Sequence, residues 1–128
     1  MSRPFTVRGR IRSVKNALNG ILIMLKSQHN AWIHALATVL ICLLGLYFGF
    51  TKSEWFWIIL AIISVWTAEA LNTAFEFLAD VSSPNYHPLV KKAKDVAAGA
   101  VLIAAIGSVV IGILIIGPYV LRFLSKGK

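Results

Sequence analysis

The N-terminal part of the chain repeats apolar residues in a helical rhythm, and three long apolar runs follow it. Within residues 5–28 the apolar positions recur at steps of three or four, which is the spacing of one helical face. These positions are Val7, Ile11, Val14, Leu18, Ile21 and Leu25. Basic residues fall largely on the other sides. We therefore expect an amphipathic helix that lies in the membrane interface, with its cations at the lipid phosphates.

Each of the three apolar runs is near the ~20 residues that a helix needs to cross the core of a bilayer. The runs span about 31–50, 55–80 and 94–117, and we expect the third helix to begin at about Leu89 or Lys94. A short polar turn at 51–54 separates the first two, and a loop at 81–88 with two prolines separates the last two. We expect Gly117 and Pro118 to end the third helix, because proline cannot continue the ladder of backbone hydrogen bonds.

The composition indicates that lipid, rather than water, surrounds most of the chain. Hydrophobic residues make up 58% and charged residues only 14%, with a mean hydropathy of +0.76, whereas about a quarter of a soluble domain is charged. The single cysteine, Cys42, excludes an intramolecular disulfide. We predict an all-α membrane protein that forms one domain over residues 1–128. It should have three transmembrane helices and an N-terminal amphipathic surface helix.

The net charge of +8 and the pI of about 10.1 would also suit a nucleic-acid-binding protein. Here the basic residues stand in short stretches beside the apolar runs, which is typical of segments that face anionic headgroups. We therefore expect a membrane, and no nucleic acid, as partner. The N-terminal segment and the second loop hold nine Lys and Arg, against four in the first loop and the C-terminal tail. The positive-inside rule then predicts a cytoplasmic N-terminus.

A polar stripe follows one face of the second membrane helix. Its members are Glu69, Asn72, Thr73, Glu76 and Asp80. At about 100° per residue they all lie within about 60° of one direction. Each ionisable group in a membrane helix costs at least ~2.5 kcal/mol, so the stripe should face protein or water. The next polar segment supplies possible partners, namely Lys91, Lys92, Lys94 and Asp95.

Two kinds of function fit such a stripe, and its spacing alone leaves both open. Carboxylate and amide oxygens can hold Mg²⁺, lysine can neutralise nucleotide phosphates, and a further carboxylate can take the proton of an alcohol. Alternatively, the stripe is a polar seam that packs helices together or lines an ion path. There is no G-x-x-x-x-G-K-[ST] loop and no protein-kinase signature. For His29 and His34 we expect a hydrogen-bonded structural role rather than proton transfer.

Four segments form a more specific pattern: Glu69-Ala-Leu-Asn72-Thr-Ala-Phe-Glu76, then Asp80, Tyr86-His87-Pro88, and Ala93-Lys94-Asp95-Val-Ala-Ala-Gly-Ala-Val. With the length and the three expected spans, this pattern resembles the bacterial diacylglycerol kinase and undecaprenol kinase family over nearly the whole chain. The resemblance favours a lipid kinase over a packing seam. It implies Mg²⁺-dependent transfer of the γ-phosphoryl group of ATP to a lipid hydroxyl. It also implies a homotrimer, with active sites between subunits, in the bacterial inner (cytoplasmic) membrane.

The resemblance also implies roles for the residues of the stripe. Glu69 matches the family's general base, Glu76 matches a metal-binding carboxylate, and Asn72 between them would orient the reacting groups. The family commonly has a second metal-binding glutamate near the end of the surface helix, where this chain has Gln28. An amide oxygen can bind Mg²⁺ but brings no charge. Either the metal binds more weakly here, or another group compensates.

Four further matches concern the nucleotide and the acceptor. Lys94 and Asp95 match residues that contact the nucleotide phosphates, and Tyr86 and His87 match a nucleotide-contacting loop. Both branches of the family share the catalytic motif. The stretches around Tyr86 and Lys94 look more like the undecaprenol kinase branch, so undecaprenol is slightly favoured over diacylglycerol as the acceptor.

Two other functions remain open. The first is a catalytically silent scaffold or lipid-binding subunit of the same fold, which only Gln28 favours. Magnesium-dependent affinity for ATP would separate it from the kinase. The second is a small ion or proton transporter that uses the acidic stripe. Proton flux into liposomes without lipid phosphorylation would support the transporter.

Overall fold

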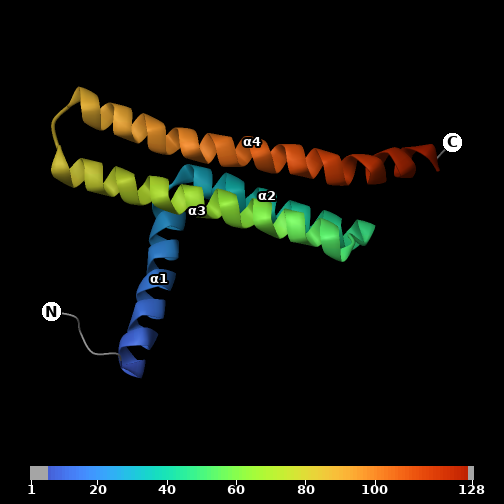
Figure 1. Cartoon of the computed structure of the whole chain (residues 1–128), viewed down its shortest axis with the longest axis horizontal. Coiled ribbons are helices and arrows are strands. Elements are labelled where there is room, and N and C mark those ends of the chain that lie inside the picture. The colour runs from blue at the N-terminus through green and yellow to red at the C-terminus, as the bar shows by residue number, and fades with distance from the viewer. Residues whose placement is uncertain (1–5, 127–128) are drawn as a thin grey trace.

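The computed structural model describes residues 6–126, and this part of the chain forms four α-helices without strands. The helices are α1 (Val7–Ser27), α2 (His29–Phe48), α3 (Lys52–Ser82) and α4 (Pro88–Ser125). Helices α2 and α4 pack along α3, whereas α1 projects from them at a steep angle (Figure 1). Helices α2, α3 and α4 are each long and apolar enough to cross a membrane. The predicted fold class is confirmed: an all-α chain with three membrane-spanning helices.

A single residue, Gln28, connects α1 to α2. Its extended backbone (φ −114°, ψ 119°) interrupts the helical path, while its N–H still donates to the carbonyl oxygen of Met24 at 3.0 Å. Helix α1 begins after Thr6, whose side chain accepts a hydrogen bond from the N–H of Gly9 at 3.1 Å. The sharp break at Gln28 turns α1 away from the other helices. Its apolar row, represented by Val7 and Ile11, is exposed, as a surface that a membrane covers would be.

Local hydrogen bonds set the start of the two long helices. Thr51 and Glu54 form a reciprocal capping box before α3. Helix α4 starts with Pro88 in its first turn, where a backbone N–H has no partner within the helix, so its absence from proline costs no hydrogen bond. The side chain of His87 caps the helix, because its Nδ1 accepts a hydrogen bond from the N–H of Leu89 at 3.2 Å. The helix therefore begins beside Leu89, the earlier of the two expected starts. This places the first basic residues of the segment inside α4 rather than in a loop.

The end of α4 differs from the prediction. Gly117 and Pro118 do not stop the helix, which continues to Ser125. Proline removes one backbone hydrogen bond, but membrane helices tolerate this when tertiary contacts hold the next turn. Such contacts follow at once, because Tyr119 Oη donates to Glu54 Oε2 at 2.8 Å. Its ring also lies 5.4 Å from the ring of Phe48.

The core between the helices is thin. Small or medium apolar side chains fill it, including Ala31, Ile58, Ala61, Val65 and Val101. Many large apolar side chains on α2, α3 and α4 point outward instead. A surface of this kind is expected where lipid tails or further membrane helices cover the protein.

Candidate active site

The buried polar residues of the described chain all belong to the predicted stripe on α3: Glu69, Asn72 and Thr73. Thr73 Oγ1 donates to the backbone oxygen of Glu69 at 2.9 Å, which satisfies the hydroxyl locally. Glu69 is fully buried, with 0% of its surface exposed. The helix therefore turns a carboxylate into the protein interior, where an unused charge would be costly.

Glu69 has one polar neighbour on another helix. His34 Nε2, from α2, lies 3.8 Å from Glu69 Oε2, which is longer than a hydrogen bond. Within the described residues, neither carboxylate oxygen of Glu69 has a hydrogen-bond partner. Leaving buried acceptors without donors costs about 1–3 kcal/mol each. Such a group is therefore prepared to accept a hydrogen bond from a bound molecule.

A second group of side chains meets one to two turns further along α3. Gln28 Nε2 donates to Glu76 Oε2 at 2.6 Å, and Asn72 Nδ2 donates to Glu76 Oε1 at 3.3 Å. The structure thus brings Gln28, at the α1–α2 break, together with Asn72 and Glu76 on α3. Asn72 Oδ1 is buried and has no partner among the described residues. The sequence predicted that these three residues belong to one site, and the geometry unites them.

The donor set of this group fits Mg²⁺, which prefers carboxylate and amide oxygens. Glu76 supplies a carboxylate, and Asn72 presents a free buried amide oxygen. Gln28 reaches Glu76 with its amide group, and rotation of that amide exchanges nitrogen for oxygen. Among the described residues, no three His, Cys, Asp or Glu side chains gather closely enough to hold a metal. A metal here would therefore depend on the amides.

The four predicted nucleotide-contacting residues lie together beyond this group, around the α3–α4 loop. They line a pocket of about 440 Å³. Lys94 Nζ pairs with Asp80 Oδ1 at 3.0 Å, and Lys91 Nζ pairs with Asp95 Oδ2 at 2.6 Å. Tyr86 is 79% exposed. The pocket thus offers two exposed cations and an uncovered aromatic ring.

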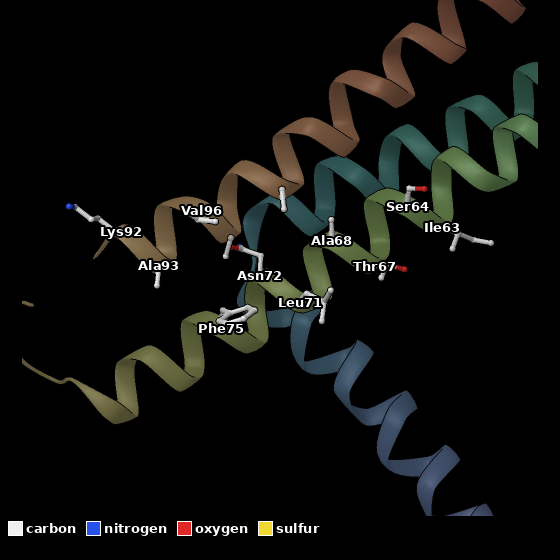
Figure 2. A pocket seen from close by; sticks show the side chains of 12 residues that line it. Ile63, Ser64, Thr67, Ala68, Leu71, Asn72, Phe75, Lys92, Ala93 and Val96 are labelled. Carbon is white, nitrogen blue, oxygen red and sulfur yellow. The ribbon is translucent and has the colours of Figure 1, made fainter. Parts of the chain in front are cut away.

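A wide groove between α3 and α4 opens beside the site. It has a volume of about 780 Å³ and contains Asn72 among mainly apolar side chains. Figure 2 shows Asn72 between the two helices, with Phe75 and Leu71 beside it and Lys92 pointing away. Glu69 does not line this groove. The amide of Asn72 therefore borders the α3–α4 groove, whereas the carboxylate of Glu69 does not.

Sequence reasoning assigned His34 a structural role and left Lys91 outside the nucleotide set. The structure places His34 against Glu69, a contact between helices that no spacing in the sequence could indicate. Lys91 had a visible signal, since it stands four residues before Asp95 and such pairs meet on a helix. That signal depends on α4 starting at Pro88 rather than at about Lys94.

Comparison with known proteins identifies the family of this constellation. The sequence model described as "Prokaryotic diacylglycerol kinase" matches residues 15–116, from α1 to the far part of α4. The chain belongs to this family. Undecaprenol kinase of Bacillus subtilis is 37% identical over 107 residues, which cover 84% of this chain and 87% of that protein. Diacylglycerol kinase of Synechocystis sp. is 45% identical over 69 residues, which cover 52% of this chain and 39% of that protein.

Membership in the prokaryotic diacylglycerol kinase family makes the chain a membrane lipid kinase. The family match includes α3 and the start of α4, and so includes both the Glu69 region and the pocket at the loop. The resemblance drawn from the motifs is thereby confirmed. The roles of individual residues remain predictions, which the geometry above makes specific.

Proposed function

We propose that this chain transfers the γ-phosphoryl group of ATP to the hydroxyl of a membrane lipid alcohol, with Mg²⁺, at the cytoplasmic membrane surface. The observation that supports this most strongly is Glu69, a fully buried carboxylate without a hydrogen-bond partner in the described chain. We favour undecaprenol as the acceptor, because the relative whose match covers 84% of this chain, at 37% identity, is an undecaprenol kinase. Diacylglycerol is the second candidate, since the family description and the Synechocystis relative name it.

Glu69 would act as the general base. The lipid hydroxyl donates a hydrogen bond to a free oxygen of Glu69, which takes the proton as the hydroxyl oxygen attacks the γ-phosphorus. The new oxygen–phosphorus bond forms while the bond from the γ-phosphorus to the bridging β,γ-oxygen breaks, which yields a lipid phosphate and ADP. Burial keeps water from competing with the lipid as acceptor. His34 contacts the same carboxylate and limits its movement.

Glu76, Gln28 and Asn72 would hold the metal. When bound, Mg²⁺ supplies positive charge that neutralises the transferring phosphate. Asn72 orients Glu76 through its hydrogen bond of 3.3 Å. Glu69 precedes Glu76 by seven residues, or roughly 10 Å along the helix at 1.5 Å per residue. The same face of α3 can therefore carry the base and the metal ligand, with the two carboxylates too far apart to contact each other.

Lys94, Asp95, Tyr86 and His87 would bind the nucleotide in the pocket at the α3–α4 loop. Lys94 exchanges its pairing with Asp80 for a phosphate, which is a charge-assisted interaction of at least equal strength. The exposed ring of Tyr86 is free to stack on the base. Asp95 holds Lys91 in place, and this brings a second cation to the pocket.

The arrangement of α1 supports a site at the membrane surface. Helix α1 branches from the bundle beside α3, and α3 and α4 continue past that level to their connecting loop (Figure 1). A groove between α1 and α3 contains Thr73 and Met24, so α1 lies at the height of the stripe. If α1 rests on the headgroups, the loop pocket projects into the cytoplasm. With a cytoplasmic N-terminus this is the inner membrane, and the outward apolar faces of the three long helices suit a homotrimer.

Labelled-phosphate transfer from ATP in mixed micelles tests the proposal. The purified protein is offered undecaprenol and diacylglycerol in parallel, with and without Mg²⁺. We expect metal-dependent labelling of undecaprenol. Glu69→Gln should reduce the rate at least about 10²-fold, the usual contribution of a general base, because an amide cannot take the proton.

Glu54→Gln is the matched control, since Glu54 lies at the opposite end of α3 and its change should leave the rate near that of the wild type. A folded Glu69→Gln variant with full activity would remove the proposed base. Failure of the folded wild-type protein to label either lipid, together with a loss of Mg²⁺-dependent affinity for ATP, would contradict the kinase. That result would favour the silent scaffold.

A further inference from the structure

The proposed base has to lose its proton before it can act again. Glu69 takes a proton from the lipid hydroxyl in each turnover, and only an ionised carboxylate can take the next one. The side chain of Glu69 is only 1% exposed, so water does not reach it directly. Repeated turnover therefore requires a neighbouring group that accepts this proton and passes it to water.

The other buried end of the stripe does not supply this group. Both carboxylate oxygens of Glu76 accept hydrogen bonds from amides, at 2.6 Å from Gln28 Nε2 and at 3.3 Å from Asn72 Nδ2. In the proposed function the same oxygens bind Mg²⁺, and a metal ligand has to stay deprotonated. Glu76 also follows Glu69 by seven residues, or roughly 10 Å along α3 at 1.5 Å per residue. The proton of Glu69 therefore needs another acceptor.

His34 is the titratable side chain that lies against Glu69. Its Nε2 is 3.8 Å from Glu69 Oε2, and its side chain is 15% exposed. Within residues 6–126, no other basic side chain lies within ion-pair distance of Glu69. A small rotation of either side chain, or one bridging water, joins the two atoms. Since imidazoles gain and lose protons near physiological pH, His34 has the chemistry of a proton carrier.

Hydrogen bonds fix the turn of α2 that carries His34 to α3. Thr38 Oγ1 donates to the backbone oxygen of His34 at 2.7 Å and accepts from Trp66 Nε1 at 3.1 Å. Trp66 precedes Glu69 by three residues, so the two lie one above the other on α3. The imidazole therefore stays opposite the carboxylate. His34 also follows Gln28 by six residues, or roughly 9 Å along α2, which places it near the expected membrane interface.

We propose that His34 is the proton acceptor that restores Glu69 after each phosphoryl transfer. The proton leaves Glu69 Oε2 for Nε2 of the neutral imidazole, and the imidazolium then releases a proton to water at the membrane interface. Only O–H and N–H bonds break and form, so the step needs no further reactant. The inference rests on the proposed function and adds a second proton transfer to it. The sequence alone favoured a structural role for His34, and its contact with Glu69 across two helices is the observation that points further.

Rapid-quench measurement of lipid labelling separates this role from a structural one. The reaction contains labelled ATP, Mg²⁺ and the lipid that the wild-type protein labels. His34→Gln should complete its first turnover at the wild-type rate, because Glu69 has not yet taken up a proton. Later turnovers should slow at least about tenfold, which gives a burst of one lipid phosphate per chain, with the KM for the lipid unchanged. His29→Gln makes the same change at an exposed position of α2 and should keep the wild-type rate in both phases.

Chemical rescue is the second measurement. His34→Ala leaves space beside Glu69, and imidazole added to the solution should restore its later turnovers. Equal slowing of the first and later turnovers in His34→Gln, or failure of imidazole to restore His34→Ala, would overturn the relay. Wild-type turnover in folded His34→Gln would also overturn it and leave the kinase intact, whereas no labelling by the wild-type protein would reject the proposed function itself. His34→Asn repeats the first measurement if His34→Gln does not fold.

Discussion

Gln28 and Glu76 form the centre of the proposed metal site, in which one of the two side chains is uncharged. Gln28 lies at the one-residue break between α1 and α2, and its amide donates to Glu76 at 2.6 Å. A glutamate at this position would set two carboxylates side by side, which repel each other until a cation separates them. The amide avoids that repulsion in the protein without metal. It also contributes no charge to the binding of Mg²⁺.

Gln28→Glu should therefore lower the Mg²⁺ concentration needed for half-maximal activity, on the order of tenfold, because the cation gains a second charged ligand. Activity measured across a Mg²⁺ titration checks this. Asn19→Asp makes the same chemical change on the exposed surface of α1 and should leave the titration midpoint unchanged. An identical Mg²⁺ midpoint for Gln28→Glu and the wild type would show that residue 28 does not bind the metal.

At the scale of the elements, the far end of the bundle is held by aromatic and polar contacts that the sequence did not predict. Tyr119, just after Pro118, bonds to Glu54 at 2.8 Å and packs 5.4 Å from Phe50. These contacts join α4 to the start of α3 and to the turn before it. They keep α4 helical through a proline that would otherwise end it.

Tyr119→Phe should lower the unfolding temperature of the protein in detergent, because Glu54 loses a hydrogen-bond donor. Tyr47→Phe removes a hydroxyl from a 71% exposed ring and should leave the unfolding temperature unchanged. Both variants should keep kinase activity, since these residues lie far from the stripe. Equal unfolding temperatures for the two variants would show that the Tyr119 contact does not stabilise α4.

Gly45 marks the closest approach between α2 and the start of α3. A Cβ at this position would lie 2.8 Å from the Trp55 ring and 2.9 Å from that of Phe50. We expect Gly45→Ala to destabilise the protein by about 2 kcal/mol, the cost of overpacking a fixed contact. In the described chain a Cβ on Gly107 meets no heavy atom within 4 Å, so Gly107→Ala is the control. Unfolding in denaturant should give a lower free energy of unfolding for Gly45→Ala than for Gly107→Ala. Equal values would mean that the Trp55 side chain moves aside without cost.

At the scale of the whole molecule, three long apolar helices form the bundle, and we predict that the end with the α3–α4 loop lies in the cytoplasm. Nine of the 13 Lys and Arg residues lie in the N-terminal segment and the region after the α3–α4 loop. Helix α1 branches from the half of α3 that leads to the α3–α4 loop, and the first turns of α4 follow that loop (Figure 1). The proposed base, the proposed metal ligands and the pocket proposed for the nucleotide follow one another along α3 towards that loop. The distribution of Lys and Arg and the position of the proposed site therefore favour the same orientation, with the α3–α4 loop in the cytoplasm.

This orientation is open to a labelling test in a Cys42→Ser background, which removes the natural thiol. Ser13 on α1 and Ser125 at the end of α4 are both exposed. In right-side-out vesicles a membrane-impermeant maleimide should react with Ser125→Cys, and with Ser13→Cys only after the membrane is opened. The opposite pattern would invert the topology and place the site outside the cell.

The sequence by itself determined the fold class, the three spans, the surface helix and the family. Hydrophobic periodicity and apolar length are local properties, and a bilayer imposes helices on any chain that crosses it. The stripe was also visible, because residues at helical spacing share a face whatever they contact. The motif with Glu69, Asn72 and Glu76 predicted a site on α3, and the roles of these residues stay predictions.

Only the tertiary structure decided which side chains meet across helices. The contact of His34 with Glu69 at 3.8 Å and that of Gln28 with Glu76 at 2.6 Å join different helices. The continuation of α4 through Pro118 likewise depends on Tyr119 and Glu54, which are 65 residues apart. Local sequence specifies the direction of a side chain on its own helix. Its partner depends on how two helices cross and in which register, and this is set by the packing of the whole chain.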